Sequence, residues 1–149
     1  INLGNVLSRE PMLLKYAKYV SKNVRAVHLP PYGSGFLALV SVDKQNEGEP
    51  KNIAMAAMTS HVNIKNVIVV DTDVDIYNPA DVMWAMSNRV DPREDIFVVP
   101  NAQGHELDPG SDETGVQNKM GIDATLAKTK GHLKKVVYPA VDLTKYRNT

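Results

Sequence analysis

An unbroken run of β-branched residues, Val67-Ile68-Val69-Val70, constrains the fold more than any other segment of this chain. Such a run suits a central β-strand that is covered on both faces, because neither side of it offers polar groups to water. Shortly afterwards, Asn78-Pro79-Ala80-Asp81 combines a capping residue, a proline at the first helical position and an acid in the first turn. This combination predicts a helix that starts there and ends near Arg89.

Helical and extended patterns alternate along the chain as far as residue 100. Besides the two segments above, we expect helices over residues 8–23 and 51–60, a short helix over 119–127, and strands over 24–29, 36–42 and 96–99. The first helix should begin at a Ser8 cap, with Pro11 in its first turn. It should bury one stripe of side chains, Leu13, Tyr16, Ala17 and Val20. The strand over 96–99 is also expected to be buried.

This order predicts an α/β fold, a three-layer or two-layer sandwich in which helices flank a mixed β-sheet. The first two strands should be antiparallel, and the crossovers from residue 42 to 67 and from 70 to 96 should be right-handed if they join parallel strands. We interpret residues 1–149 as one domain, with a first helix over 1–23, an α/β core over 24–100, a loop over 101–118 and a C-terminal segment over 119–149. A loop of that length in a compact domain is usually functional or disordered.

Composition argues against several classes of protein. The 17 basic and 17 acidic residues cancel, whereas proteins that bind nucleic acid by charge carry a basic excess, so we expect no nucleic-acid partner. The one basic cluster is typical of a solvated tail and consists of Lys128, Lys130, Lys134 and Lys135. No stretch approaches the roughly 18 unbroken apolar residues of a membrane span. The chain has no cysteine, which fits a cytoplasmic location. It begins with Ile1 and not Met, so we expect a fragment or a processed product.

Asp71, Asp73 and Asp75 form the most conspicuous polar run. Three acids at alternate positions can bind a hard cation, but an EF-hand loop would need Gly and Glu where Ile76 and Val82 stand. We favour a polar strand end that leads into the helix cap, with cation binding as the alternative. No metal site is therefore assigned.

Other familiar catalytic patterns are also missing. The histidines lie far apart, without the spacing of zinc motifs; they are His28, His61, His105 and His132. Ser34 lies between two glycines, but the five-residue pattern of a hydrolase nucleophile is incomplete and precedes a strand. These residues alone predict an α/β domain and assign it no chemistry.

Three segments carry a family resemblance. They read KNVIVVDTDVDIYN (65–78), DVMWAM (81–86) with RVDP (89–92) and Asp95, and KMGIDAT (119–125). Together with VHLP (27–30), they resemble the C-terminal domain of the UbiD-type decarboxylases, the polyprenyl-hydroxybenzoate carboxy-lyase family. The resemblance covers most of the chain from about Ser8 to Thr125.

The resemblance implies part of an enzyme that removes or adds a carboxyl group on aromatic or α,β-unsaturated acids. The family uses prenylated FMN, with a divalent metal (Mn) and potassium at its phosphate. The family's catalytic Glu-Arg-Glu set lies in the N-terminal and central region, which nothing here matches. No catalytic residue is therefore carried over, and the isolated chain is expected to be inactive. In the family, this domain follows a linking helix, here residues 1–23, packs against the flavin-binding catalytic domain and contributes to homo-oligomer contacts.

The resemblance also implies two substrate-binding residues. In the family, a loop after the last strand helps to wall the pocket of the small aromatic acid substrate, and it aligns with residues 104–109. Leu107 matches the family's pocket-lining leucine and would act by shape. His105 replaces a residue that is often small or aromatic, and it could offer a hydrogen bond or a charge. Residues 59–61 stand where some members have a basic residue for the cofactor phosphate, so cofactor-binding residues stay unassigned.

Two rival functions remain open. The chain can be a stand-alone accessory or assembly subunit that docks on a separate catalytic chain. It can also be a small-molecule-binding domain that uses the loop at His105. The sequence does not determine which substrate is used, or whether decarboxylation or carboxylation is the physiological direction.

Overall fold

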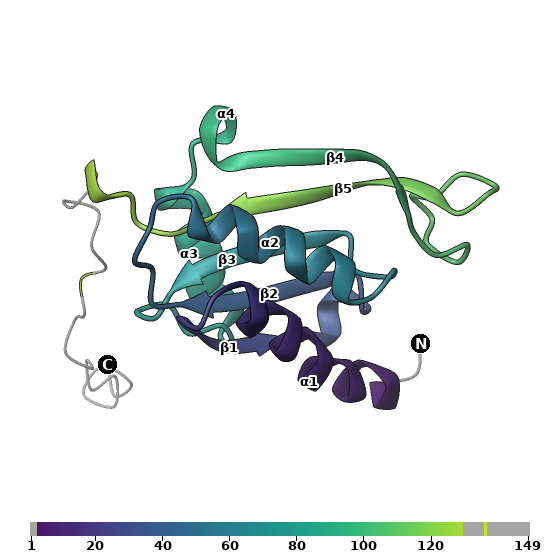
Figure 1. Ribbon diagram of the computed structural model, residues 1–149, viewed down its shortest axis with the longest axis horizontal. Helices are drawn as coiled ribbons and strands as arrows, with labels where there is room; N and C mark the ends of the chain where they lie inside the picture. The colour runs from purple at the N-terminus through teal and green to yellow at the C-terminus, as the bar shows by residue number, and fades with distance from the viewer. Residues whose placement is uncertain (1–2, 130–135, 137–149) are drawn as a thin grey trace, which may run out of the picture.

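The computed structural model describes residues 3–129 and residue 136, with the backbone alone for residues 3–7. In chain order the elements are α1 (Leu3–Val20), β1 (Val24–His28), the 3-10 turn η1 (Pro31–Gly33), β2 (Leu37–Val42), α2 (Glu49–Ser60), β3 (Asn66–Asp71), α3 (Pro79–Arg89), α4 (Pro92–Asp95), β4 (Ile96–Gln103) and β5 (Val116–Asp123) (Figure 1). Most of the basic tail and His132 lie outside the described residues.

The five strands form one mixed sheet in the order β1-β2-β3-β5-β4. β3, which contains the β-branched run, is the central strand and pairs in parallel with both β2 and β5. β1 is antiparallel to β2, as expected, and β4 is antiparallel to β5. The crossover from β2 to β3 therefore joins parallel strands. The connection from β3 to β4 does not, because β4 is antiparallel to β5 and therefore runs opposite to β3, so the handedness rule has no bearing on it.

Helices cover both faces of the sheet, which makes the fold a three-layer α/β sandwich (Figure 1). α1 and α2 pack on one face, where Leu13 and Ile53 are fully buried against residues such as Val69. α3 packs on the other face, where Val82 and Ala85 contact the second buried cluster. The central strand is thus covered on both sides, as its composition predicts.

The helix start predicted at Asn78 is confirmed in atomic detail. The Asn78 side chain accepts a hydrogen bond from the Ala80 N–H at 3.1 Å, and Pro79 takes the first helical position. The Asn78 side chain thus pairs with one of the backbone N–H groups at the start of α3 that have no partner within the helix. Pro79 has no N–H group, so its position leaves none unpaired.

The first helix differs from the prediction in its start and in its buried face. It begins at Leu3, so Ser8 and Pro11 lie inside it. Leu13 and Ala17 are buried, but Tyr16 and Val20 are 43% and 45% exposed. Only a narrow side of α1 contacts α2 and β1, and the expected stripe is wider than that contact.

The predicted loop over 101–118 is shorter in the structure, and the predicted helix over 119–127 is wrong. β4 continues to Gln103 and β5 begins at Val116, so the two form a long hairpin whose connecting loop spans only 104–115. β4 is an edge strand and not a buried one, with Val98 57% exposed. Gly121 lets β5 approach the Phe97 ring of β4, because a Cβ atom there would overlap that ring. Within the described part of the chain, no helix has the length and apolarity needed to cross a membrane.

Candidate functional site

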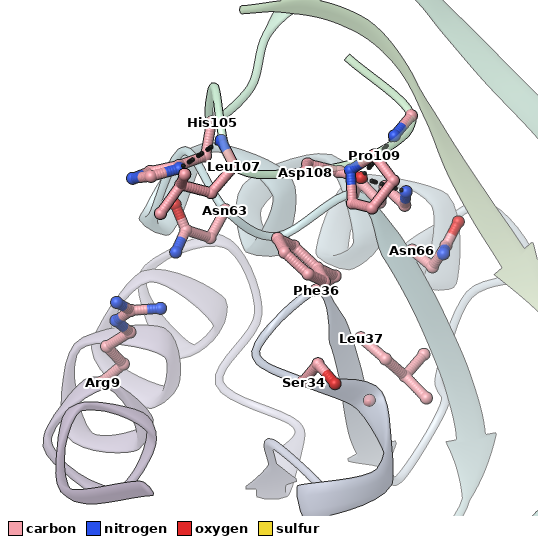
Figure 2. Close-up of a pocket in the computed structure, with 13 residues that line it drawn as sticks. Arg9, Ser34, Phe36, Leu37, Asn63, Asn66, His105, Leu107, Asp108 and Pro109 are labelled. Carbon is pink, nitrogen blue, oxygen red and sulfur yellow. Dashed lines mark hydrogen bonds and ion pairs between the residues drawn. The ribbon is translucent and has the colours of Figure 1, made fainter. Parts of the chain in front are cut away.

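A cavity of about 790 Å³ lies at the edge of the sheet where β2 and β3 begin (Figure 2). Parallel strands start at the same edge, so the segments that precede β2 and β3 lie side by side there. The hairpin loop 104–115 reaches the same edge, because β5 also starts there. The cavity is lined by Arg9, Gly33, Ser34, Phe36, Leu37, Asn63, Lys65, Asn66, His105, Leu107, Asp108, Pro109 and Gly110.

The turn before β2 forms one wall of the cavity. Ser34 and Gly35 both have positive φ angles, of 54° and 82°, which turn the chain sharply after η1. The Gly33 N–H donates to the Pro30 carbonyl and the Phe36 N–H to the Gly33 carbonyl, at 2.9 Å each. The turn thereby places Phe36 in the cavity wall at the start of β2. Ser34 shapes this wall, and no nucleophilic role is assigned to it.

The hairpin loop is held by bonds among its own residues. The Leu107 N–H donates to His105 Nδ1 at 3.0 Å, and the Asp108 N–H donates to the His105 carbonyl at 2.9 Å. The Ser111 hydroxyl donates to the same carbonyl at 2.9 Å. Because Nδ1 of His105 accepts this hydrogen bond, Nε2 is the ring nitrogen left to donate.

Lys65 and Asp108 join the hairpin loop to the start of β3. Lys65 Nζ lies 2.8 Å from Asp108 Oδ1, and only 1% of the Asp108 side chain is exposed. Burial alone would raise the pKa of Asp108, but hydrogen bonds from Lys65 and the Gly110 N–H, together with the Lys65 charge, hold that pKa below its ordinary value. The Lys65 ammonium also lies 5.5 Å from the centre of the Phe36 ring. These contacts fix the loop against the cavity.

The structure brings the two predicted site residues together. His105 and Leu107 both line the cavity, and Leu107 is 82% exposed (Figure 2). An apolar side chain in that position loses water contact only when another surface covers it. Sequence reasoning missed Arg9, Phe36 and Lys65. Lys65 stands two residues before the β-branched run and Phe36 follows the Gly-rich turn, so both carried a local signal, whereas Arg9 carried none.

The acidic run lies at the other end of β3 and is occupied by an arginine. Arg89 lies 3.0 Å from Asp71 and forms two hydrogen bonds with Asp73, at 2.8 and 2.9 Å. The Arg89 guanidinium also stacks 4.9 Å from the Trp84 ring centre. Burial raises the pKa of Asp71 above its ordinary value, although the Leu126 N–H and the Arg89 charge act in the opposite direction. Asp75 accepts from the Tyr77 N–H and its own N–H donates to Asp81, so it organises the turn before α3.

The remaining candidates also have local partners. His28 Nδ1 lies 3.0 Å from Glu10 Oε1, and His61 Nδ1 accepts from the Asn63 N–H at 3.2 Å. The Thr59 and Ser60 hydroxyls donate to carbonyls of their own helix. Among the described residues, no three histidine or acidic side chains gather as a metal site would require.

Comparisons with known proteins place the chain in a family. The family model described as "3-octaprenyl-4-hydroxybenzoate carboxy-lyase C-terminal domain" matches residues 3–124. The anhydromevalonate phosphate decarboxylase of Methanothermobacter thermautotrophicus is 41% identical over 120 residues, which are 80% of this chain and 28% of that protein. The phenolic acid decarboxylase of Escherichia coli O157:H7 is 39% identical over 115 residues, 75% of this chain and 24% of that protein.

Solved structures agree with this placement. The UbiD-class enzyme HmfF from Pelotomaculum thermopropionicum, in complex with FMN, matches with a TM-score of 0.85 and 39% identity, over 93% of this chain and 32% of that one. An evolved dimeric form of HmfF in complex with prFMN matches with a TM-score of 0.74 and 31% identity, over 93% of this chain and 29% of that one. The chain thus spans about 28% of the length of the first curated relative. It belongs to the UbiD family of carboxy-lyases, whose C-terminal domain it matches from residue 3 to residue 124.

Proposed function

We propose that this chain is the C-terminal domain of a prenylated-FMN-dependent decarboxylase that acts on aromatic or α,β-unsaturated carboxylic acids. In this proposal the domain supplies one wall of the substrate pocket and no catalytic group. The observation that carries it is the cavity in which exposed Leu107 and the His105 N–H donor lie together. The relatives with the same domain are decarboxylases, and their names include both a phosphorylated acid and phenolic acids.

The cofactor would be held by the rest of the enzyme. Prenylated FMN with Mn²⁺ and K⁺ requires ligands for its metals and donors for its phosphate. The described residues offer no cluster of metal ligands, and the hydroxyls of Thr59 and Ser60 are engaged within α2. These residues do not fit the cofactor, so we assign its binding to the flavin-binding region.

The surface that we propose contacts the rest of the enzyme lies on the outward faces of α1 and α2. Tyr16, Tyr19 and Val20 of α1 are exposed there, as is Met55 of α2. Apolar side chains gathered in this way are suited to burial against another protein surface. We assign them to contacts with the flavin-binding region and with further copies of the enzyme. A cytoplasmic location belongs to the same proposal, and the absence of cysteine supports it.

The pocket role is tested in the complete enzyme with His105→Ala and Leu107→Ala. Leu107→Ala removes apolar contact with the substrate, so its KM should change about tenfold for some acids and little for others. His105→Ala should change substrate preference through the lost N–H donor. Glu106→Ala is the matched control, because Glu106 lies in the same loop and does not line the cavity. Flavin binding should be unchanged in all three.

Wild-type kinetics for both variants, across a panel of aromatic and unsaturated acids, would remove the loop from the active site. The isolated 149-residue chain supplies a second test, because without a positioned acid and base it has no route for proton transfer. It should release no CO₂ from the same acids when prenylated FMN and Mn²⁺ are added. Measurable release would show that the domain is catalytic.

A further inference from the structure

We propose that Lys44, Asp71 and the backbone of Leu126 form a clasp that fixes the direction in which the chain leaves the sheet after β5. The segment concerned, residues 124–128, follows β5 and leads to the C-terminal part of the chain. The clasp lies where β2 and β3 end, whereas the cavity lies where they begin. The inference therefore goes beyond the proposed function and involves no substrate.

Lys44 joins the loop after β2 to the segment after β5. Its ammonium group donates to the Thr125 hydroxyl at 3.0 Å and to the Leu126 carbonyl at 2.7 Å, and it lies 3.1 Å from the Glu47 carboxylate. Only 6% of the Lys44 side chain is exposed. An ammonium group has three donors, so each of them has a partner here. Two of the donors hold the segment after β5, and the third holds Glu47 in the loop of Lys44 itself.

Asp71 holds the same segment from the end of β3. Its Oδ2 atom accepts a hydrogen bond from the Leu126 N–H at 2.6 Å and lies 3.0 Å from Arg89 of α3. The N–H and the carbonyl of Leu126 are thus both bound by charged side chains, which come from the ends of two neighbouring strands. Hydrogen bonds to charged groups are roughly twice as strong as neutral ones. They fix the Leu126 peptide groups in both position and direction.

Two further carboxylates hold the backbone on either side of Leu126. Asp123 accepts from the Thr125 N–H at 3.0 Å and from the Thr125 hydroxyl at 2.5 Å. Glu47 accepts from the Lys128 N–H at 3.3 Å. These bonds extend over residues 125–128, which lie beyond the last residue of β5. The segment is therefore held by side chains and not by strand pairing.

The groups that hold this segment come from distant parts of the sequence. Figure 1 shows the chain after β5 leaving on the same side of the molecule as the loop between β2 and α2. The segments that carry the family resemblance supply Asp71, Arg89, Asp123 and Thr125, and none of these four residues lines the cavity. The first acid of the run at residues 71–75 thus has a role that requires no cation: it holds the exit of the chain.

The test measures the direction of the exit in the complete enzyme, with spin labels at Asn52→Cys and Thr129→Cys. Both positions are exposed, one on α2 and the other just after the clasp. We expect one narrow distribution of distances between the labels, and a broad one after Lys44→Met, because the Leu126 carbonyl and the Thr125 hydroxyl lose their donor. Lys22→Met is the matched control, since Lys22 is an exposed lysine outside the clasp, and it should leave the distribution narrow.

Hydrogen exchange in the complete enzyme separates the clasp from a general effect on stability. In Lys44→Met the Leu126 amide should exchange about 10- to 100-fold faster, the usual effect of losing a hydrogen bond to a charged group, while the Val69 amide of β3 keeps its rate. Thr125→Val removes a single hydroxyl and should show a smaller acceleration, which keeps the test available if Lys44→Met does not fold. An unchanged rate at Leu126 in both variants, an equal acceleration at Val69, or a narrow distance distribution in Lys44→Met would overturn the clasp.

Discussion

Arg89 shows how a motif that suggests metal binding can be structural. Its side chain is buried, and its guanidinium contacts Asp71 and Asp73 in the place that a bound cation would take. We predict that Arg89→Met lowers the free energy of unfolding by about 3 kcal/mol, because two neighbouring carboxylates lose their counterion. This loss of unfolding free energy is small for a broken buried ion pair, because the Asp73 side chain is about half exposed and water can hydrate it.

Urea unfolding would measure this cost, with Arg25→Met as the matched control. Arg25 and Asp43 form an ion pair of 3.3 Å in which both side chains are about half exposed, and such pairs contribute roughly 0–1 kcal/mol. Equal losses for the two variants would mean that the buried cluster does not stabilise the end of β3.

The residues that line the cavity were predictable only in part at this scale. His105 and Leu107 could be found because they lie close together in a loop with a family counterpart. Arg9 could not, because it is one of many polar residues on a surface helix, and only the folded chain brings it to the hairpin loop. Residues that meet by tertiary packing leave no local pattern in the sequence.

At the scale of elements, Lys119 joins β5 to the end of α2. It is 5% exposed, and its ammonium group donates to the carbonyls of Val62 and Ile64 at 3.0 and 2.8 Å, with Met58 further away at 3.4 Å. Burial lowers the pKa of Lys119 below its ordinary value of 10.5. Between the lowered pKa and 10.5 the unfolded chain binds more protons than the folded chain, so stability rises with pH in that window.

We therefore predict that the wild type gains stability relative to Lys119→Met as the pH approaches 10.5 from below. At neutral pH the variant should already be less stable by about 1–3 kcal/mol, because the carbonyls lose their donor. Urea unfolding of both proteins over a series of pH values measures the difference, and Lys15→Met serves as an exposed control. Curves for the wild type and Lys119→Met that stay parallel up to the ordinary pKa would contradict the prediction.

The same residue explains why β5 was mistaken for a loop and a helix. Gln117 and Lys119 are the buried residues at the start of this strand, while the alternate positions are exposed or half-buried. The strand thus turns polar side chains inward, and the usual alternation of apolar and polar residues is missing. By contrast, β3 and α3 were predicted correctly because composition and capping agree with their surroundings.

For the whole molecule, the strand order was the part that the sequence could not predict. β5 inserts between β3 and β4, which follow each other among the strands of the chain, and this turns β4 into an edge strand. The hydrophobic pattern of β4 is the same for a central strand and for an edge strand. The strand that pairs with β4 is set by contacts between residues far apart in the sequence, which this pattern does not contain. The fold class depends less on that order, which is why it could be predicted.

The position of the hairpin loop leads to a prediction about the complete enzyme. Residues 104–115 project beyond α2 and β3 (Figure 1), and the loop leaves Leu107 largely exposed. It gains little from apolar burial to offset its ordering entropy. In hydrogen exchange, we expect its amides to exchange much faster than those of β3 in the isolated chain, and to become protected in the complete enzyme. Equal exchange of the loop in both forms would mean that the flavin-binding region does not cover it.

The way the loop is attached also makes it transplantable. Its bonds run mainly among its own residues, and the Lys65–Asp108 pair links it to the body of the domain. Substitutions at positions such as 105 and 107 are therefore expected to leave the sheet undisturbed, provided that this link is kept. On the proposed pocket role, a family with such a hairpin can change which acids it accepts by exchanging this one short loop, while selection for folding acts on a sheet that stays the same.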